Sequence, residues 1–349
     1  MKKAFSLAAL LVAFYLNIQA QTLTAMRDSI PGGYDFWFYE PCNGSKHFDS
    51  QPPKKPLVVY LHGKSLSGHD LNKVRRYGTI HAIEKGLDID AFVAAPQTTP
   101  PSWNPEKVWQ MVQWCCAHYP IDRDRIYVLG MSMGGSGSFN TAAAYPDKFA
   151  AAMPICGNCH AKSYCSLCTI PIYALHGTED HDMPITLTEK VVNGMIACGD
   201  TSRLIFLPLQ GRNHSVLARL FYLKETYDWL FSHSLKDPGR PVCKDIRITN
   251  SMLDDAYSHL IGKAPHITVI DNGYKGKEVV SANTKVSADM SSTKAPSNKK
   301  TSGRIHKVKK GDTLASIAKR NHTTVKTLCR MNGLKETSVL QIGQKIKLP

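Results

Sequence analysis

A serine between two glycines lies in residues 130–134, whose sequence is GMSMG. The pattern G-x-S-x-G is typical of a nucleophile elbow, in which the serine stands on a tight turn between a strand and a helix. A side chain at either glycine position would collide with neighbouring backbone, and the turn directs the first helical amides toward a developing oxyanion. Here the pattern follows an apolar run, residues 126–129, and precedes an alanine-rich stretch. We therefore predict that Ser132 is a catalytic nucleophile.

A serine nucleophile requires a histidine base and an acid that orients the histidine. In proteins with this elbow, the acid and then the histidine follow the serine along the chain. Asp180 follows the apolar run 172–175, and His214 follows the apolar run 204–207. Because the carboxyl ends of parallel strands meet at one edge of a sheet, both side chains are expected near the nucleophile. The sequence predicts a triad that consists of Ser132, Asp180 and His214.

The choice of the acid stays open at this stage. Glu179 and Asp182 are close to Asp180 in the sequence, and a loop adjustment of one residue would exchange their positions. His214 is the single histidine of its loop, so the base has no such competitor. Two other histidines lie near the ends of apolar runs, and we expect structural roles for them because buried polar groups are normally hydrogen-bonded: His62 and His176.

The tetrahedral intermediate of acyl transfer requires backbone amides that bind its oxyanion. One amide is expected from Met133, directly after the nucleophile, and another from Lys64, in the loop after the apolar run 57–61. His214 would deprotonate Ser132 for attack on an ester carbonyl, and water would resolve the acyl-enzyme. This chemistry requires no cofactor and no metal, and we predict neither.

The elements that must position these residues follow from the hydrophobic pattern between residues 34 and 233. Apolar runs typical of buried strands alternate there with stretches that have helical spacing. Such alternation indicates a mostly parallel sheet covered by helices on both faces, which is a doubly wound α/β fold. The expected strands are residues 57–61, 90–95, 126–129, 150–155, 172–175 and 204–207, and the expected helices are 106–118, the stretch up to 145, 184–198 and 215–233.

The two ends of the chain indicate export and further segments. Residues 1–20 combine two lysines, an apolar run too short to span a bilayer and a small residue before the cleavage point, as in a signal peptide. We predict that residues 21–239 form the catalytic domain and that the protein lies in the periplasm, in the cell envelope or outside the cell. Residues 240–304 are expected to be a weakly structured, basic linker with one short helix at 252–261 and a hairpin around 271–273.

The formal net charge of +15 is unevenly distributed. Residues 240–349 contain 21 Lys and Arg against 8 Asp and Glu, so most of the net charge lies after the catalytic domain. Such a segment suits an anionic partner, for example nucleic acid, a membrane surface or an acidic wall polymer. It is equally consistent with a solvated linker.

Four motifs together resemble the α/β-hydrolase superfamily: YLHG (60–63), GMSMGG (130–135), HGTEDHDMP (176–184) and NH (213–214). Their spacing is most similar to the group of dienelactone hydrolases, carboxylesterases and feruloyl or acetylxylan esterases, over residues 34–233. The resemblance implies the fold and the triad but no particular substrate. In that group an apolar residue stands two positions after the acid, where this chain has Asp182, and this departure also leaves the choice of acid open.

Residues 305–349 resemble a LysM module and are expected to fold as a small βααβ unit. The matching segments are VKKGDTL (308–314), IA (317–318), NG (332–333) and IGQKI (342–346). LysM modules bind N-acetylglucosamine-containing glycans, in bacteria usually peptidoglycan, so the resemblance implies such a partner. The expected contacts include the loop of Gly311, Asp312, Thr313 and Leu314. The other predicted partner is an acyl-ester substrate, and neither nucleic acid nor a membrane span is expected.

Ten cysteines in a chain with an export signal favour disulfides over reduced thiols. Four of them form two closely spaced C-x-x-C pairs, Cys156 with Cys159 and Cys165 with Cys168. We expect one or two local disulfides in this segment. A zinc site and a redox site are the less favoured alternatives, since the two pairs are closer together than in a zinc ribbon.

Trp103 follows the expected strand 90–95 and is a candidate for the wall of a substrate pocket. An aromatic ring at such a place would suit a sugar ring or an aryl acid. Simple packing of the loop is an equally good interpretation, because tryptophan often buries only its apolar body.

The sequence thus predicts an exported carboxylic ester hydrolase that cleaves an acylated glycan or a related ester through an acyl-enzyme and is targeted to peptidoglycan by a LysM module. A serine peptidase of the prolyl oligopeptidase type has the same triad order and is an alternative. A noncatalytic peptidoglycan-binding protein is a second alternative, although a mere scaffold offers no physical reason to keep all three triad residues.

Overall fold

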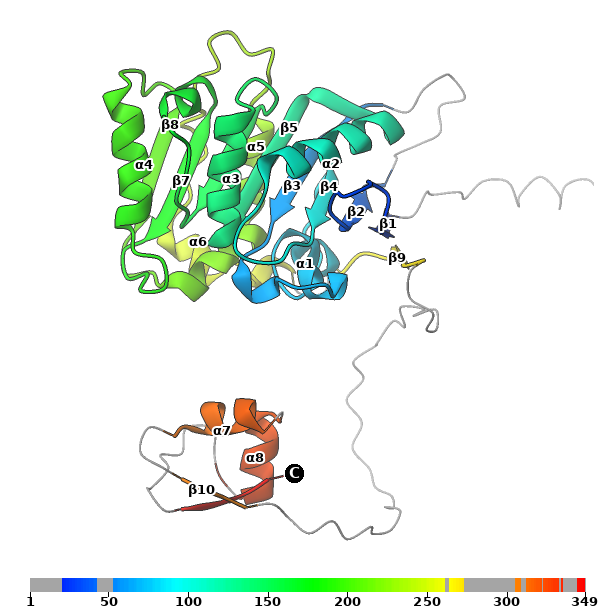
Figure 1. Cartoon of the computed structure of the whole chain (residues 1–349), viewed down its shortest axis with the longest axis vertical. Helices are drawn as coiled ribbons and strands as arrows, with labels where there is room; N and C mark the ends of the chain where they lie inside the picture. Colours follow the sequence, from blue (N-terminus) through cyan, green and yellow to red (C-terminus); the bar gives the residue numbers. More distant parts are fainter. Residues whose placement is uncertain are drawn as a thin grey trace, which may run out of the picture. The chain divides into compact units, whose positions relative to one another are not determined.

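The computed structural model describes residues 21–42, 53–260, 264–272, 305–308, 312–321, 323–332, 334 and 344–348. The chain divides into two compact units, Met1–Ala282 and Asn283–Pro349 (Figure 1). The predicted signal peptide, residues 1–20, lies outside the described residues. In the part of the chain that is described, none of the helices has the length and apolar character that crossing a membrane requires.

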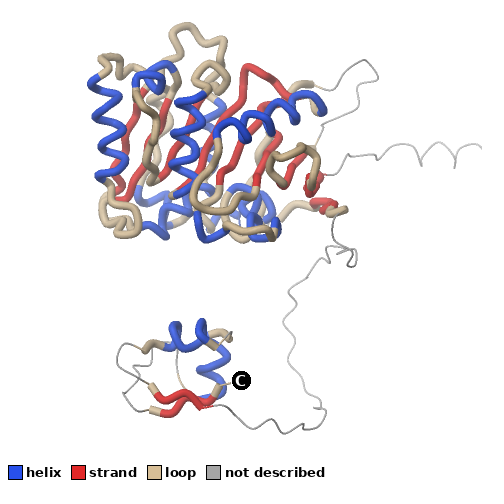
Figure 2. The backbone as a smooth tube through the Cα atoms, viewed as in Figure 1, coloured by secondary structure: helices blue, strands red, loops and turns tan. Residues whose placement is uncertain are grey.

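A nine-stranded sheet forms the centre of the first unit (Figure 2). Its strands are β1 (Gln21–Met26), β2 (Phe36–Glu40), β3 (Lys55–Leu61), β4 (Phe92–Pro96), β5 (Ile121–Met131), β6 (Ala151–Ile155), β7 (Ile172–Gly177), β8 (Leu204–Leu209) and β9 (Ile267–Ile270). They lie in the order β8-β7-β6-β5-β3-β4-β2-β1-β9. The strands from β8 to β4 pair in parallel, whereas β2 is antiparallel to both β4 and β1.

The side chains of the central strands alternate between two cores, one on each face of the sheet. In β3, Leu57, Val59 and Leu61 pack into one core, and Val58 and Tyr60 pack into the other. All five are fully buried, which is the pattern of a parallel strand covered on both faces. The first core is covered by α2 (Pro105–His118), α3 (Met133–Ala144) and α4 (Thr186–Ala197), and the second by α1 (Thr79–Glu84), α5 (Lys224–Phe231) and α6 (Asn250–Asp254). The predicted doubly wound α/β fold is therefore confirmed.

Helix α2 begins where the sequence provides an N-terminal cap. The side-chain oxygen of Asn104 accepts hydrogen bonds from the amides of Glu106, at 2.8 Å, and Lys107, at 3.2 Å. Pro105 occupies the first helical turn, where an amide donor would have no helical acceptor. The same cap fixes the end of the loop that joins β4 to α2.

The closing helix expected at residues 215–233 is two helices in the structure. A 3-10 helix, η4 (His214–Tyr222), is followed by α5, and the chain is extended between them at Leu223, where ψ is 131°. In a 3-10 helix the side chains at positions i and i+3 share a face. Leu217 and Leu220 have this spacing and are fully buried, so the tighter winding gives η4 its apolar face.

Residues 240–272 differ from the expected linker, because they pack on the first unit. Six apolar side chains of this segment are buried in its second core: Val242, Ile248, Leu253, Ala256, Leu260 and Ile267. Strand β9 pairs in parallel with β1, and Arg27 binds Asp271 through two hydrogen bonds of 3.0 and 2.9 Å. The predicted hairpin around 271–273 extends into residues 273–304, which lie outside the described residues together with the rest of the predicted linker.

The second unit has the predicted βααβ order. It consists of β10 (Ile305–Lys307), α7 (Leu314–Arg320), α8 (Val325–Asn332) and β11 (Lys345–Lys347), and β10 pairs with β11 in an antiparallel ladder. Its small core includes Val308, Ile317, Leu328 and Ile346. Asn332 joins α8 to β11, because its side-chain amide donates to Lys347 O at 2.9 Å and its oxygen accepts from Lys347 N at 2.7 Å.

Candidate active site

Ser132 lies between β5 and α3 with a backbone φ of 62° and ψ of −121°. A positive φ is strained for a residue with a Cβ atom, and such strain persists only where the surrounding structure holds it. The turn is held on both sides, because Ser132 N donates to Ile155 O at 2.9 Å and Ser136 N donates to Ser132 O at 2.9 Å. The serine therefore stands on the sharp turn that the sequence predicts.

The glycines of this turn permit it to approach β3 very closely. A Cβ atom on Gly134 would lie 1.9 Å from Leu61 O, and one on Gly130 would lie 2.5 Å from the same oxygen. Distances this short are incompatible with any side chain. The two glycines of the motif are thus required by the packing of the turn against the end of β3.

Asp180 and His214 meet at the carboxyl ends of β7 and β8. Asp180 Oδ2 accepts a hydrogen bond from His214 Nδ1 at 2.7 Å, and the Asp180 side chain is fully buried. Asp180 Oδ1 accepts from the amides of Asp182, at 3.0 Å, and Met183, at 2.8 Å. The side chains of Glu179 and Asp182 are exposed. Of the three acids weighed from the sequence, the structure pairs Asp180 with the histidine, and Asp182 contributes its backbone amide.

The hydrogen bond to Asp180 leaves Nε2 of His214 available to a nucleophile. Ser132 and His214 do not hydrogen bond to each other in the described structure, and such contacts often form only in the complex with substrate. Ser132 and His214 lie at the same edge of the sheet, and the end of β6 connects them. Ser132 N donates to Ile155 O, and Cys156, which follows Ile155, contacts His214.

His176 fixes the loop that carries Asp180. Its ring is fully buried, with Nδ1 2.8 Å from Thr188 Oγ1 and Nε2 2.7 Å from Met183 O. Thr188 in turn donates to Gly157 O at 2.6 Å. Burial lowers the pKa of His176, which favours the neutral ring. This histidine has the structural role that we expect from its place in the sequence.

Cys156 is a member of the site that the sequence analysis did not identify. It is fully buried with a positive φ of 40°, and its Sγ lies 3.6 Å from His214 Nδ1. Within the described residues, Cys156, Asp180 and His214 form a group whose donor atoms all lie within 4.8 Å of one another. Burial raises the pKa of the thiol, so it is neutral, and Asp180 and His214 already bind each other. A hydrogen bond between Asp180 and His214 with a neutral thiol beside it therefore explains these three groups better than a bound metal ion does.

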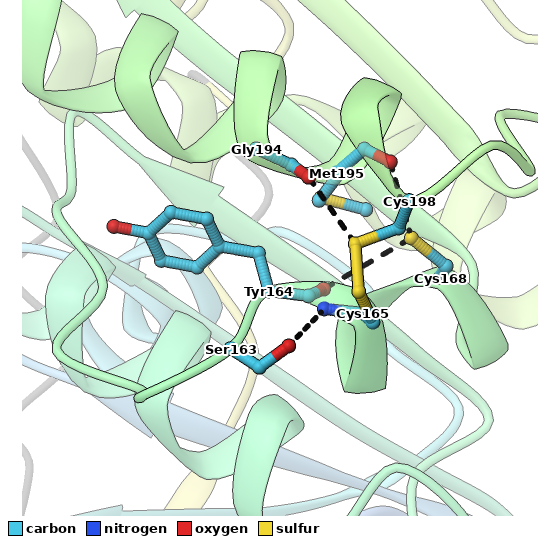
Figure 3. Close-up of a disulfide and its surroundings, with 7 residues drawn as sticks. All are labelled: Ser163, Tyr164, Cys165, Cys168, Gly194, Met195 and Cys198. Atoms are coloured by element: carbon cyan, nitrogen blue, oxygen red, sulfur yellow. Dashed lines mark hydrogen bonds between the residues drawn. A yellow bond between two sulfur atoms is a disulfide. The ribbon is translucent and has the colours of Figure 1, made fainter.

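The cysteine pairing expected from the sequence is wrong. Cys165 forms a disulfide with Cys198, 33 residues further along the chain, and not with a neighbour in its own segment (Figure 3). The 3-10 helix η3 (Cys165–Thr169) packs beside α4, which brings the two Cα atoms to 5.4 Å. The other cysteines of the two C-x-x-C pairs are unpaired, buried thiols: Cys156, Cys159 and Cys168.

The residues expected to bind the oxyanion lie at the beginnings of two helices. Met133 is the first residue of α3, and Lys64 is the first residue of the 3-10 helix η1 (Lys64–Leu66). Amides at such positions have no acceptor within their own helix. A Cβ atom on Gly63 would lie 3.6 Å from Ser132 Cβ, so the loop that begins η1 passes close to Ser132. The fold thus brings both segments to the serine.

Trp103 is buried in the core beneath the loop after β3. It is 3% exposed, its Nε1 donates to His62 O at 3.1 Å, and its ring is 4.8 Å from the His62 ring. A Cβ atom on Gly137 would lie 2.6 Å from the indole. The tryptophan packs against the loop after β3, in agreement with the interpretation that it fills space in the loop packing.

His62 is a fully buried histidine that joins the loops after β3 and β4. Its Nδ1 lies 2.8 Å from Gly63 O, and its Nε2 accepts from Thr98 N at 3.2 Å. Only the neutral ring can donate at one nitrogen and accept at the other. Burial lowers the pKa of His62 to about 4, in agreement with this geometry.

In the second unit, the residues expected to contact a glycan have different environments. Asp312 binds His306 Nε2 at 2.7 Å and Arg320 at 3.3 Å, and Leu314 is buried in the core. Thr313 is exposed, although its Oγ1 accepts from Ser316 N at 3.1 Å. Gly311 lies outside the described residues.

The pairing of Asp180 with His214 predicts a large difference between two neighbouring acids. Asp180→Asn should lower kcat/KM for p-nitrophenyl acetate by about 10⁴-fold, since an amide supplies neither the charge nor the correct tautomer of the histidine. The matched variant Asp182→Asn keeps the backbone amide that binds Asp180 and should stay within about threefold of the wild type. A loss of activity in Asp182→Asn that equals the loss in Asp180→Asn would contradict the assignment.

The buried, neutral His62 predicts acid sensitivity of the fold. Its pKa falls from about 6.5 in the unfolded chain to about 4 in the folded protein, so below pH 6.5 the unfolded state binds a proton that the folded state does not. The free energy of unfolding should therefore decrease by about 3 kcal/mol as the pH falls from 6.5 to 4.

This decrease can be measured by denaturant unfolding between pH 7 and pH 4. The variant His62→Gln should lack this part of the pH dependence, and substitution of the exposed His69 by Gln should retain it. Parallel pH curves for the wild type and His62→Gln would show that His62 does not contribute.

Two family models match parts of the chain. Residues 105–223 match the model of the Phospholipase/Carboxylesterase family, and residues 306–349 match the model of the LysM domain. Among curated proteins, the uncharacterized lipoprotein YgeR of Escherichia coli (strain K12) is 45% identical over 47 residues, which are 14% of this chain and 19% of that protein. The chain thus spans about a fifth of the length of this relative.

Solved structures with a similar fold include esterases. They are a thermostable esterase (24% identical, 62% of this chain and 64% of that chain, TM-score 0.49), an acetyl xylan esterase from Aspergillus awamori (13%, 56% and 94%, TM-score 0.43) and a mutant of the feruloyl esterase module from Clostridium thermocellum complexed with sinapinate (16%, 58% and 86%, TM-score 0.44). The match spans less than two thirds of the thermostable esterase. The family matches, together with the sheet order and the elbow, confirm the expected resemblance: the first unit has the α/β-hydrolase fold, its residues 105–223 are similar to the phospholipase/carboxylesterase family, and residues 306–349 are similar to the LysM domain.

Proposed function

We propose that this chain is an exported serine esterase in which Ser132, Asp180 and His214 act as the catalytic triad. The observation that carries the proposal is the 2.7 Å hydrogen bond from His214 to the buried Asp180, at the same sheet edge as the strained serine turn. A serine in this position is of use mainly as a nucleophile, because the strained turn serves to expose its hydroxyl. The match to the Phospholipase/Carboxylesterase family supports an ester as the substrate.

The proposed reaction has two half-reactions. His214 Nε2 takes the proton of Ser132 Oγ as the oxygen attacks the ester carbonyl, while Nδ1–H remains bound to Asp180. The amides of Met133 and Lys64 bind the oxyanion of the tetrahedral intermediate. His214 then protonates the leaving alcohol, and the acyl group stays on Ser132 until a water molecule, deprotonated by the same histidine, releases the acid.

Export is supported by two features of the chain. Residues 1–20 have the pattern of a signal peptide, and the Cys165–Cys198 disulfide suits an oxidising compartment. The C-terminal LysM domain supports a glycan that contains N-acetylglucosamine, such as peptidoglycan, as the surface to which the enzyme is targeted. The enzyme would then act in the cell envelope or outside the cell.

Hydrolysis of p-nitrophenyl acetate by the wild type and by Ser132→Ala tests the esterase. The wild type should show steady turnover, and the variant should lose about 10⁴-fold or more in kcat, because it lacks the nucleophile. A thermal melt of both proteins controls for folding. Equal rates in the two proteins would rule out Ser132 as the nucleophile. If neither protein reacts, the noncatalytic and peptidase alternatives remain, and peptide substrates then distinguish them.

Sedimentation with insoluble peptidoglycan tests the role of the second unit. The mature chain should pellet with the polymer and be released by soluble N-acetylglucosamine oligomers. A chain that ends at Ala282, the boundary between the two units, should remain in solution and keep its esterase activity. Equal binding by the shortened chain would place the glycan site in the first unit and contradict targeting by LysM.

A further inference from the structure

Cys156 stands between the strands that carry the nucleophile and the acid. It directly follows β6, which lies between β5 and β7 in the sheet, and Ser132 and Asp180 come after those two neighbours. The amide of Cys156 donates to Leu175 O on β7 at 2.8 Å, and the preceding Ile155 accepts from Ser132 N at 2.9 Å. The backbone at the end of β6 is thus hydrogen-bonded to both sides of the site.

The backbone conformation of Cys156 is unusual for a residue that has a side chain. Its φ of 40° lies in the left-handed region, where a Cβ atom is strained and glycine is the ordinary occupant. Such strain persists where the surrounding structure holds it, and it is concentrated at functional sites. The result of this conformation is that the sulfur of Cys156 reaches both Asp180 and His214.

The thiol of Cys156 has one suitable hydrogen-bond acceptor in the pair that Asp180 and His214 form. Its Sγ is 3.6 Å from His214 Nδ1. Nδ1 of the neutral ring carries one hydrogen, which is bound to Asp180 Oδ2 at 2.7 Å, so Nδ1 cannot also accept the thiol hydrogen. The carboxylate of Asp180 can accept it, and it lies within hydrogen-bonding reach of the thiol.

Asp180 Oδ2 has capacity for a second donor. A carboxylate oxygen has two lone pairs, and His214 uses one of those on Oδ2. His176 Nε2 lies 3.5 Å from the same oxygen, but it donates to Met183 O at 2.7 Å. The amides of Asp182 and Met183 bind the other oxygen, Oδ1. A lone pair of Oδ2 thus remains for the thiol.

The groups around the thiol keep its hydrogen in place. Burial raises the pKa of Cys156 most, the charge of Asp180 raises it further, and the backbone of Ser132 opposes the rise. Asp182 adds a smaller rise to the pKa of the thiol. Burial also raises the pKa of Tyr77, which faces Cys156, and lowers the pKa of His176, which faces Asp180, so both are neutral near neutral pH. The thiol is therefore a neutral donor beside a charged acceptor, which strengthens the hydrogen bond between them.

We propose that Cys156 is a positioning residue of the triad, whose thiol donates a hydrogen bond to Asp180 and holds the imidazole of His214 with Nε2 turned toward Ser132. The inference rests on the proposed esterase function and adds to it a group that acts through Asp180 and His214. The sulfur packs on the Nδ1 side of the ring and thereby limits its rotation. The thiol also shares the charge of Asp180, so the imidazolium releases its proton to the leaving alcohol more readily.

The pH dependence of p-nitrophenyl acetate hydrolysis by the full chain tests this role. Cys156→Ala removes the donor and should lower kcat about tenfold with little change in KM, the loss expected for a hydrogen bond to a charged group. The acid limb of the profile should move to higher pH, because the carboxylate, without the thiol, holds the proton on His214 more tightly. Cys156→Ser supplies a hydroxyl donor of similar size and should restore both kcat and the acid limb.

Cys159→Ala is the matched control, because Cys159 is a buried thiol of the same segment that packs into the other core. This variant should keep the kcat and the acid limb of the wild type, and thermal melts check that every variant is folded. Wild-type kinetics in Cys156→Ala would overturn the proposal. An equal loss of kcat in Cys156→Ala and Cys156→Ser, with an unchanged acid limb, would overturn it too, since the thiol would then only fill space.

The infrared S–H stretching band of Cys156 gives a second test, which needs no turnover. Subtraction of the spectrum of the matching Cys156→Ala protein isolates this band in the wild type and in Asp180→Asn. In Asp180→Asn, the amides of Asp182 and Met183 keep the side-chain oxygen at the Oδ1 position, so an NH₂ group replaces the acceptor Oδ2. The band should therefore move to higher frequency, as for a thiol that loses its acceptor.

The two measurements separate this inference from the proposed function. An unchanged S–H frequency in Asp180→Asn would overturn the hydrogen bond from Cys156, whether or not the protein is an esterase. A shifted band in a protein whose wild type does not hydrolyse p-nitrophenyl acetate would support the hydrogen bond and contradict the esterase.

Discussion

The close approach of the turn between β5 and α3 to its neighbouring strands is the constraint on which the candidate site depends. Leu61 O at the end of β3 occupies the space that side chains on Gly130 and Gly134 would need, and Ile155 O at the end of β6 accepts the amide of Ser132. This packing on both sides maintains the positive φ of the serine, because relaxation of the turn would break contacts with two buried strands. The same two strands continue into the loop of Gly63 and Lys64 and into Cys156. Ser132 is therefore fixed relative to the loop of Gly63 and Lys64 and to Cys156, which contacts His214.

Positions along the chain that depend on local chemistry could be predicted from the sequence. The elbow, the central strands, helix α2 and the places of Asp180 and His214 after their strands follow from hydrophobic runs and turn residues. The choice among three acids could not be predicted, because it depends on which carboxylate turns inward. In the structure, two backbone amides bind Asp180 Oδ1 and thereby turn its other oxygen toward the histidine.

Features that depend on contacts between distant segments could not be predicted from the sequence. Cys165 forms a disulfide with Cys198 because η3 packs on α4. The spacing of cysteines along the chain does not predict that contact. Residues 240–272 resemble a linker in sequence because their apolar residues have no regular period, yet six of their apolar side chains are buried in the second core of the first unit. Trp103 is buried because Gly137 leaves room for the indole, and the sequence does not indicate that these two residues meet.

Burial also determines the electrostatics around the triad. The groups closest to the catalytic pair are a thiol whose pKa is raised at Cys156 and an imidazole whose pKa is lowered at His176. Both are neutral near neutral pH, as is His62 beside the loop of Gly63 and Lys64. Asp180 is therefore the acidic group in direct contact with His214, and neither Cys156 nor His176 adds a charge beside this pair. In the proposed reaction, the positive charge that His214 gains is balanced by the carboxylate that already orients its ring, so orientation and charge stabilisation arise from the same hydrogen bond.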